Sequence, residues 1–229
     1  MSLSSQQHEY LKLLGIDVWV SRDSGVIGSA VNVDMPADTQ GPDVNWAQLR
    51  EQVSVCKKCP LHQGRTQTVF GSGSESADWM IIGEAPGAEE DLQGEPFVGR
   101  AGKLLTSMLQ AMGLDRKQVF IANILKCRPP NNRDPAPDEV ACCEDYLKQQ
   151  IAMVRPKIIL AVGRIAAQNL LKIDTPIGKM RGQRYQYAGL NIPVIVTYHP
   201  AYLLRSPREK RKAWQDLQAA MHYYGEIKQ

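Results

Sequence analysis

Four short apolar runs stand out between positions 79 and 198. They are residues 79–82, 119–122, 157–162 and 192–198. Each run is apolar at successive positions instead of alternate ones, a pattern typical of parallel strands that helices cover on both faces. We therefore predict an α/β fold of three layers, in which a central four-stranded parallel sheet carries helices on both faces.

The segments between these runs repeat apolar residues at the spacing of helices. The clearest stripe extends from Leu104 to Met112 and is expected to form a core face, with Gly113 ending the helix. The helices predicted in this way are 45–54, 101–112, one that begins at Pro137, one that follows Gly163, and 207–224. The polar and basic stretch 178–189 is expected to be a hairpin or a loop.

The chain divides into three parts by composition. Residues 1–20 hold a short, partly apolar segment with the sequence HEYLKLLGIDVWV. Residues 21–44 are rich in Ser, Gly, Asp, Asn and Pro without any period, so we interpret them as a linker. Residues 45–229 form the main domain. The first segment is expected either to dock on that domain as a helix or to bind a partner, with Trp19 as its anchor.

Composition excludes several classes of protein. The 229 residues carry a net charge of +3 and a pI near 8.6, which is only mildly basic. No apolar run approaches the roughly 20 residues that span a membrane, and no basic region followed by an apolar core marks a signal peptide. We expect a cytoplasmic, monomeric protein. Its five cysteines then indicate a metal site or free thiols rather than disulfides.

The cysteines are spaced unevenly along the chain. Cys56 and Cys59 form a C-x2-C pair, Cys127 lies in a basic loop rich in proline, and Cys142 and Cys143 lie near a helix start. Four thiolates from these positions fit zinc or an iron–sulfur cluster. A redox pair at the C-x2-C motif and merely buried apolar cysteines are the alternatives.

Polar residues follow the ends of the predicted strands. Gly83-Glu84, Asn123, Gly163 and His199 each terminate one apolar run. The carboxyl ends of parallel strands meet at one edge of a sheet, where ligands of α/β proteins bind. Taken singly, Asn123 suits a turn cap and His199 a structural role. Together with a carboxylate in one cleft, they form a plausible reactive group of residues.

Several motifs agree in order and spacing with one family. They are GEAPG from Gly83, PFVG from Pro96, Asn123, the run KCRPPNNRDP from Lys126, and HPAYLL from His199. Residues 45–224 thereby resemble the family 4 uracil-DNA glycosylases. The resemblance implies the glycosylase fold and a [4Fe–4S] cluster on Cys56, Cys59, Cys127 and Cys143, which leaves Cys142 as the spare cysteine. The cluster is expected to hold the Arg/Pro loop near DNA.

The same resemblance implies roles for the residues around the base. His199 looks like the electrophile that hydrogen-bonds uracil O2, and Asn123 like the residue that reads N3–H and O4. Phe97 looks like the ring stacked on the base. Glu90 is similar to the residue that crowds the methyl position of thymine. The implied reaction is hydrolysis of the N-glycosidic bond of a flipped uracil.

Further implied roles lie at the edges of this site. Glu84 is expected to place or activate water, and Gly83 and Ala85 to line the uracil pocket. Classical uracil-DNA glycosylases carry an Asp at the position of Ala85, so water activation departs from their pattern. Leu203 is similar to the wedge that replaces the flipped base, or else it is a core leucine. Arg205 leads a basic stretch that either contacts phosphates or forms a solvated face.

The N-terminal segment carries a second, short resemblance. The sequence LLGIDVW is similar to the N-terminal peptide of the psi subunit of bacterial DNA polymerase III, which implies a clamp-loader partner for residues 1–20 in a bacterial cell. Three hypotheses follow. The chain is an active glycosylase, a replisome-associated DNA-binding module with weak catalysis, or a zinc-stabilised nucleic-acid-binding protein.

Overall fold

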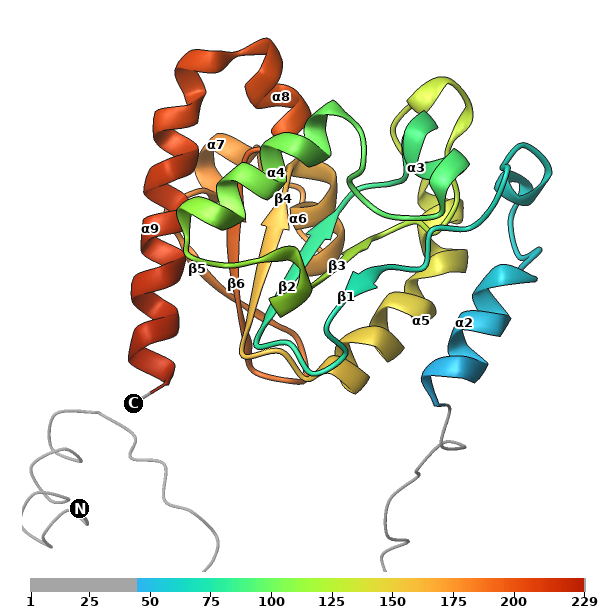
Figure 1. The fold of residues 1–229 in the computed structure, drawn as a ribbon, viewed down its shortest axis with the longest axis horizontal. Helices are drawn as coiled ribbons and strands as arrows, with labels where there is room; N and C mark the ends of the chain where they lie inside the picture. Colours follow the sequence, from blue (N-terminus) through green and yellow to red (C-terminus); the bar gives the residue numbers. More distant parts are fainter. Residues whose placement is uncertain (1–44, 229) are drawn as a thin grey trace, which may run out of the picture. The chain divides into compact units, whose positions relative to one another are not determined.

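A computed structural model describes residues 45–228 of the chain, which fold around one sheet (Figure 1). The sheet has six strands in the order β1-β3-β2-β4-β6-β5. The strands are β1 (Ser72–Gly73), β2 (Trp79–Gly83), β3 (Val119–Asn123), β4 (Ile158–Val162), β5 (Arg184–Tyr187) and β6 (Ile192–Thr197). Within the described residues, no helix is long and apolar enough to cross a membrane.

The four strands predicted from apolar runs form the middle of the sheet and are parallel. β2 lies between β3 and β4, and β6 continues the sheet beyond β4. The predicted total of four strands is wrong, because β1 and β5 pair antiparallel with the two outer members of this set. β1 has only two residues, too few for a pattern. β5 alternates exposed and half-buried residues, as an edge strand does, and makes the hairpin that was one of two expectations for 178–189.

Helices cover both faces, so the three-layer prediction is confirmed. The helices are α2 (Trp46–Ser54), α3 (Ala88–Gln93), α4 (Arg100–Ala111), α5 (Pro137–Val154), α6 (Arg164–Leu171), α7 (Ile177–Met180), α8 (Pro200–Arg205) and α9 (Lys210–Ile227). Short 3-10 turns occur at Pro60–Gln63, Arg116–Gln118, Pro130–Asn132 and Pro207–Glu209. The final helix predicted at 207–224 therefore begins with a 3-10 turn and extends three residues further.

Alternate residues of each central strand pack into different halves of the core. Met80 and Ile82 of β2 lie in a cluster with α2, α5 and α6, whereas Trp79 and Ile81 lie in a second cluster with α4, α8 and α9. All residues of β2, β3, β4 and β6 are buried. This two-sided burial is the reason that the apolar runs are continuous.

Candidate active site

A cleft of about 430 Å³ lies at the carboxyl ends of the parallel strands. Its wall combines the ends of β2 and β3, the start of α8 and the loop between β3 and α5. The lining residues include Glu84, Ala85, Glu90, Phe97, Asn123, His199 and Arg205, together with Asn132, Arg133, Asp134 and Tyr202. The structure therefore brings together the predicted strand-end residues Glu84, Asn123 and His199. The volume is in the range of small-molecule sites.

Asn123 ends β3 and is 2% exposed, yet its Oδ1 has no hydrogen-bond partner. Gly83 is its register partner at the end of β2. A Cβ on Gly83 would lie 2.5 Å from Asn123 Oδ1 and 2.5 Å from the tip of the Phe97 ring. Only glycine lets the amide and the ring approach this strand. A buried acceptor without a partner is costly, so its presence beside a cleft indicates a ligand that donates to it.

Phe97 is held in an unusual backbone conformation. Its φ is +56°, in the left-handed region that bulky residues rarely adopt. Arg116 donates from Nη1 to the Phe97 carbonyl at 3.2 Å and from Nη2 to the Pro96 carbonyl at 2.7 Å. Gly102 of α4 leaves the space that the Phe97 backbone occupies. This support sets the buried Phe97 ring against the cleft, with its centroid 5.7 Å from that of His199.

His199 is fixed as a neutral imidazole with a defined tautomer. The Ala201 backbone N–H donates to Nδ1 at 3.1 Å, so the ring proton of the neutral form lies on Nε2. Burial, assisted by Arg205, lowers the pKa of His199 to about 4, while Glu90 acts weakly in the opposite direction. At neutral pH the residue therefore offers an Nε2–H donor without a full charge. Gly163 keeps the space beside the His199 Cβ open, since a Cβ there would lie at 3.0 Å.

Glu84 is half-buried in the same cleft. Burial raises its pKa to about 7, Asp134 adds to the shift by repulsion, and Arg164 opposes it. A carboxyl group with a pKa near the working pH can exist both as an acid and as a base. The two long-range influences come from residues that the sequence analysis did not select.

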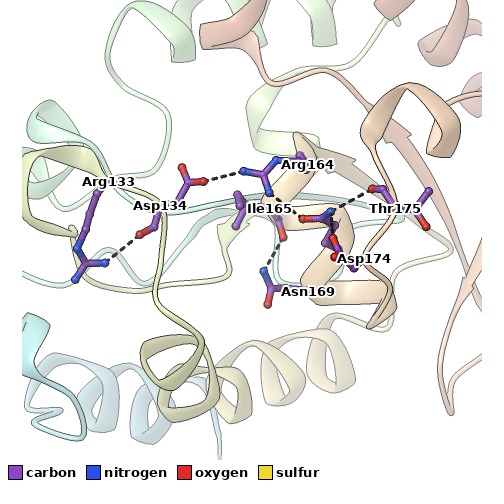
Figure 2. Close-up of polar contacts among 8 residues, drawn as sticks. Arg133, Asp134, Arg164, Ile165, Asn169, Asp174 and Thr175 are labelled. Atoms are coloured by element: carbon purple, nitrogen blue, oxygen red, sulfur yellow. Dashed lines mark hydrogen bonds and ion pairs between the residues drawn. The ribbon is translucent and has the colours of Figure 1, made fainter.

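Asp134 and Arg164 form a bridge at the rim of the cleft (Figure 2). Arg164 Nη2 lies 2.7 Å from Asp134 Oδ2, so the start of α6 is joined to the loop between β3 and α5. Arg133 donates to the Asp134 carbonyl at 3.0 Å and binds Glu139 in a bidentate ion pair at 2.9 and 2.6 Å. These contacts hold a loop that proline residues keep out of regular structure.

Glu90 has a structural task that its position in the sequence did not indicate. It lies on α3, a helix that was not among those predicted from the sequence. Its carboxylate accepts hydrogen bonds from the backbone N–H groups of Gly87, Val98 and Gly99 at 3.0–3.1 Å. Glu90 thus ties the turn after β2 to the segment after Phe97. Both segments line the cleft, as do Glu90 itself and the half-buried Ala85.

The two leucines of α8 differ sharply in exposure. Leu203 is 1% exposed and packs in the core with α4 and α9, whereas Leu204 is 36% exposed. A side chain that enters DNA must be accessible, so the burial of Leu203 favours its interpretation as a core leucine over its interpretation as a wedge. Arg205, at the end of the same helix, lines the cleft and is exposed.

All five cysteines line a second pocket, between α2, α5 and the loop after β3. Burial raises the pKa of Cys143 to about 11 and also raises the pKa values of Cys59 and Cys127. Reactive thiols show the opposite shift, which disfavours a redox pair. Within residues 45–228, no three Cys, His, Asp or Glu side chains are arranged to hold a single metal ion.

Two cysteines already have basic neighbours. Arg65 Nη1 donates to Cys127 Sγ at 3.0 Å, and the Lys126 backbone N–H donates to Cys143 Sγ at 3.3 Å. The buried Lys126 side chain lies nearby, and burial lowers its pKa to about 8. Positive charge around sulfur suits thiolate ligands. Neither Arg65 nor Lys126 was selected as a site residue, although Lys126 belongs to the KCRPPNNRDP motif.

Residues 1–44 lie outside the described part of the chain. The predicted segment 1–20, its anchor Trp19 and the linker 21–44 all fall there. Their sequence interpretations remain predictions.

The chain is similar to glycosylases over most of its length. Residues 70–218 match the uracil DNA glycosylase superfamily. The chain is 48% identical over 171 residues to the type-4 uracil-DNA glycosylase of Archaeoglobus fulgidus, covering 72% of this chain and 86% of the relative. It is 43% identical over 178 residues to the type-4 enzyme of Thermotoga maritima, covering 76% and 92%.

Similarity to another class of the superfamily is lower. The type-5 uracil-DNA glycosylase of Pyrobaculum aerophilum is 32% identical over 183 residues, covering 70% of this chain and 80% of the relative. The superfamily match begins just before β1 and ends within α9, so it includes every strand-end residue described above. The chain therefore belongs to the uracil-DNA glycosylase superfamily, in which it is more similar to these type-4 relatives than to this type-5 relative.

Proposed function

We propose that the chain is a monofunctional uracil-DNA glycosylase, which hydrolyses the N-glycosidic bond of uracil in DNA and leaves an abasic site. One observation carries the proposal beyond the family. The buried Asn123 Oδ1 has no protein partner, and it lies in one cleft with a neutral His199 and a half-buried Glu84. Uracil offers the donor that this acceptor lacks.

Recognition follows from the Asn123 amide. Its Oδ1 accepts from uracil N3–H and its NH2 donates to O4, whereas cytosine presents an acceptor at N3 and a donor at C4 and would leave both groups unpaired. The Phe97 ring provides an apolar surface for stacking the base. Gly83 and Ala85 leave room for the base beside the strand end. Because uracil inside a duplex is out of reach, the nucleotide is flipped into the cleft.

Bond cleavage is assigned to charge stabilisation by His199. When the bond between C1′ and N1 breaks, its electron pair leaves with the base, and negative charge develops on uracil O2. The Nε2–H of neutral His199 donates to that oxygen. A neutral donor matches this task, because it stabilises the developing charge without requiring a buried cation before the reaction.

Glu84 is the carboxylate proposed to place the attacking water. The water oxygen forms the new bond to C1′, and its proton passes to Glu84 or to solvent. The small Ala85 leaves Glu84 as the acidic side chain at the end of β2. Glu90, whose carboxylate holds three backbone N–H groups, shapes the wall near uracil C5, where the methyl group of thymine would lie.

We assign a [4Fe–4S] cluster to Cys56, Cys59, Cys127 and Cys143. Zinc and an iron–sulfur cluster both take four thiolates, and the similarity to type-4 glycosylases favours the cluster. A four-iron cluster takes one thiolate at each iron, which suits cysteines spread around a pocket. When bound, the cluster supplies cross-linking of three chain segments rather than hydrolytic chemistry.

The DNA contacts are assigned to α8 and the residues after it. Leu204, exposed where Leu203 is buried, is our candidate for the apolar side chain that fills the gap left by the flipped base. Arg205 is positioned to contact a phosphate beside the flipped nucleotide.

The function is tested by uracil release from an oligonucleotide with a single uracil, using the iron-replete full chain. Matched oligonucleotides with cytosine or thymine at the same position serve as controls. We expect cleavable abasic sites from the uracil substrate alone. An absence of uracil release under these conditions would contradict the glycosylase and favour the DNA-binding module.

Residues 1–20 are proposed, on sequence resemblance alone, to bind a replisome partner such as a bacterial clamp loader. The full chain and its Trp19→Ala variant can be compared for binding to the clamp-loader complex by surface plasmon resonance. We expect the variant to lose binding while its uracil release is unchanged. Equal binding by both proteins would remove Trp19 as an anchor.

A further inference from the structure

A fully buried lysine lies between the cysteine pocket and the uracil cleft. Lys126 is 1% exposed, and its Nζ donates to the Asn123 carbonyl at 2.9 Å and to Gln150 Oε1 at 2.6 Å. Gln150 of α5 is itself fully buried and donates from Nε2 to the Phe70 carbonyl at 2.8 Å. The Lys126 side chain thus holds the backbone of the residue that we assign to uracil recognition.

Lys126 has no carboxylate to balance its charge. None of the ion pairs among residues 45–228 involves it. A buried ammonium without a counter-charge is strongly destabilising, so the observation calls for a negative group nearby. The available group is the cysteine site. Burial lowers the pKa of the Lys126 ammonium, and the negative charge of a Cys143 thiolate opposes that shift. The Lys126 backbone N–H also donates to Cys143 Sγ at 3.3 Å, and the next residue is Cys127.

We propose that Lys126 is a positioning residue that couples the cysteine site to uracil recognition, with its ammonium balancing the negative charge of cluster-bound thiolates while it fixes the Asn123 backbone. The coupling to recognition rests on the proposed function, whereas the charge balance does not. Under this proposal the cluster has a second role besides cross-linking, which is to balance the charge of Lys126. Loss of the cluster would leave Lys126 without its counter-charge.

Arg65 provides a comparison within the same molecule. Its guanidinium donates to Cys127 Sγ and to the Ser54 carbonyl, each at 3.0 Å. One contact is with a cysteine and the other with the end of α2, and neither involves Asn123. Arg65 therefore contributes charge to the cysteine site without holding the uracil reader, and its substitution separates the two roles of Lys126.

The test compares Lys126→Met, Arg65→Met and an exposed control, Lys148→Met on α5. Lys148 is 52% exposed and makes only surface ion pairs. We expect Lys126→Met and Arg65→Met to shift the reduction potential of the cluster in the negative direction, because a nearby positive charge is lost. Lys126→Met should lower the single-turnover rate of uracil release by about tenfold or more, and by more than Arg65→Met does, with unchanged DNA affinity. Lys148→Met should keep the wild-type rate.

A second variant covers the case in which Lys126→Met loses iron or fails to fold. Gln150→Leu keeps the Lys126 charge and removes its anchor, so we expect full iron content and a lower rate of uracil release. Wild-type potential and rate in Lys126→Met, or a wild-type rate in Gln150→Leu, would overturn the proposal. If the wild-type chain releases no uracil, the proposed function fails, and the potentials of the lysine and arginine variants still test the charge balance.

Discussion

The uracil cleft and the cysteine pocket both include residues of the loop after β3, but they differ in whether their polar groups have hydrogen-bond partners. In the cleft, Asn123 Oδ1 is buried without a partner, and His199 keeps an Nε2–H donor free of any contact described above. In the cysteine pocket, Cys127 and Cys143 already accept hydrogen bonds from Arg65 and Lys126. The cleft therefore keeps an acceptor and a donor without protein partners, whereas these two sulfurs of the cysteine pocket already have partners in the protein.

This difference distinguishes a site that exchanges its ligand from one that keeps it. A substrate site needs free donors and acceptors so that binding restores hydrogen bonds that the protein lacks. A permanent site needs its ligating atoms held in place by a surrounding shell before the ligand arrives. The two sites also share one segment, since residues 123–127 carry both the uracil reader and a cysteine ligand.

Substitution of His199 by Ala is the most severe test of the cleft. It removes the Nε2–H donor, and the loss of one such donor typically lowers the rate by about 10²–10³-fold. The measurement is the single-turnover rate on a single-uracil oligonucleotide. His222→Ala is the control, because the His222 side chain lies on α9 and is 74% exposed. This variant should release uracil at the wild-type rate. A near wild-type rate in His199→Ala would remove this residue from the chemistry.

Substitution of Cys143 by Ser tests the cysteine pocket, with Cys142→Ser as its neighbour control. We expect Cys143→Ser to lose iron, because Cys143 is buried on the inner face of α5 and its Sγ accepts from Lys126. Cys142→Ser should keep a full complement. Iron and sulfide are measured per chain, together with the visible absorption of the cluster. The opposite result would assign the fourth ligand to Cys142, which lines the same pocket.

The elements that the sequence predicted correctly are those with a clear apolar pattern over several residues. The continuous apolar runs of β2, β3, β4 and β6 follow from burial on both faces, and their ends delivered Glu84, Asn123 and His199 to one edge. β1 escaped prediction because two residues have no period. The bridge between Asp134 and Arg164 and the contacts of Lys126 with Gln150 join positions 24–30 residues apart, and such pairing depends on tertiary packing that no local pattern records.

Asn123→Asp changes the amide whose buried Oδ1 has no partner in the cleft. A carboxylate still accepts from N3–H, but it cannot donate to O4 and brings a negative charge near the leaving uracil anion. We expect uracil release to fall by about ten- to a hundredfold and discrimination against cytosine to weaken. Asn191→Asp, on the exposed turn between β5 and β6, is the control. Unchanged rate and specificity would show that Asn123 does not contact the base.

The smallest expected effect concerns the titration of Glu84. Since its pKa in the folded chain is about 7, compared with an ordinary value of 4.5, the ionised form gains population as the pH rises through 7. If ionised Glu84 places the water, the single-turnover rate of the wild type should rise across this range, and Glu84→Gln should be slower and lack the rise. His199 cannot produce the same limb, because its pKa is about 4.

The stability of the wild-type fold should fall over the pH range in which the rate of uracil release rises. Between pH 4.5 and 7 the folded chain binds a proton at Glu84 that the unfolded chain releases, so the wild type loses stability as the pH rises through this interval. Glu84→Gln removes that loss and should raise the free energy of unfolding at pH 8, relative to the wild type, by about 1 kcal/mol more than at pH 4. The difference is small because Glu84 is only half-buried and solvent screens its charge. Glu51→Gln, on the exposed face of α2, should show no such difference. A Glu84→Gln variant that keeps the wild-type pH profile in both rate and stability would mean that the carboxyl group at the end of β2 is not the one that titrates in the cleft.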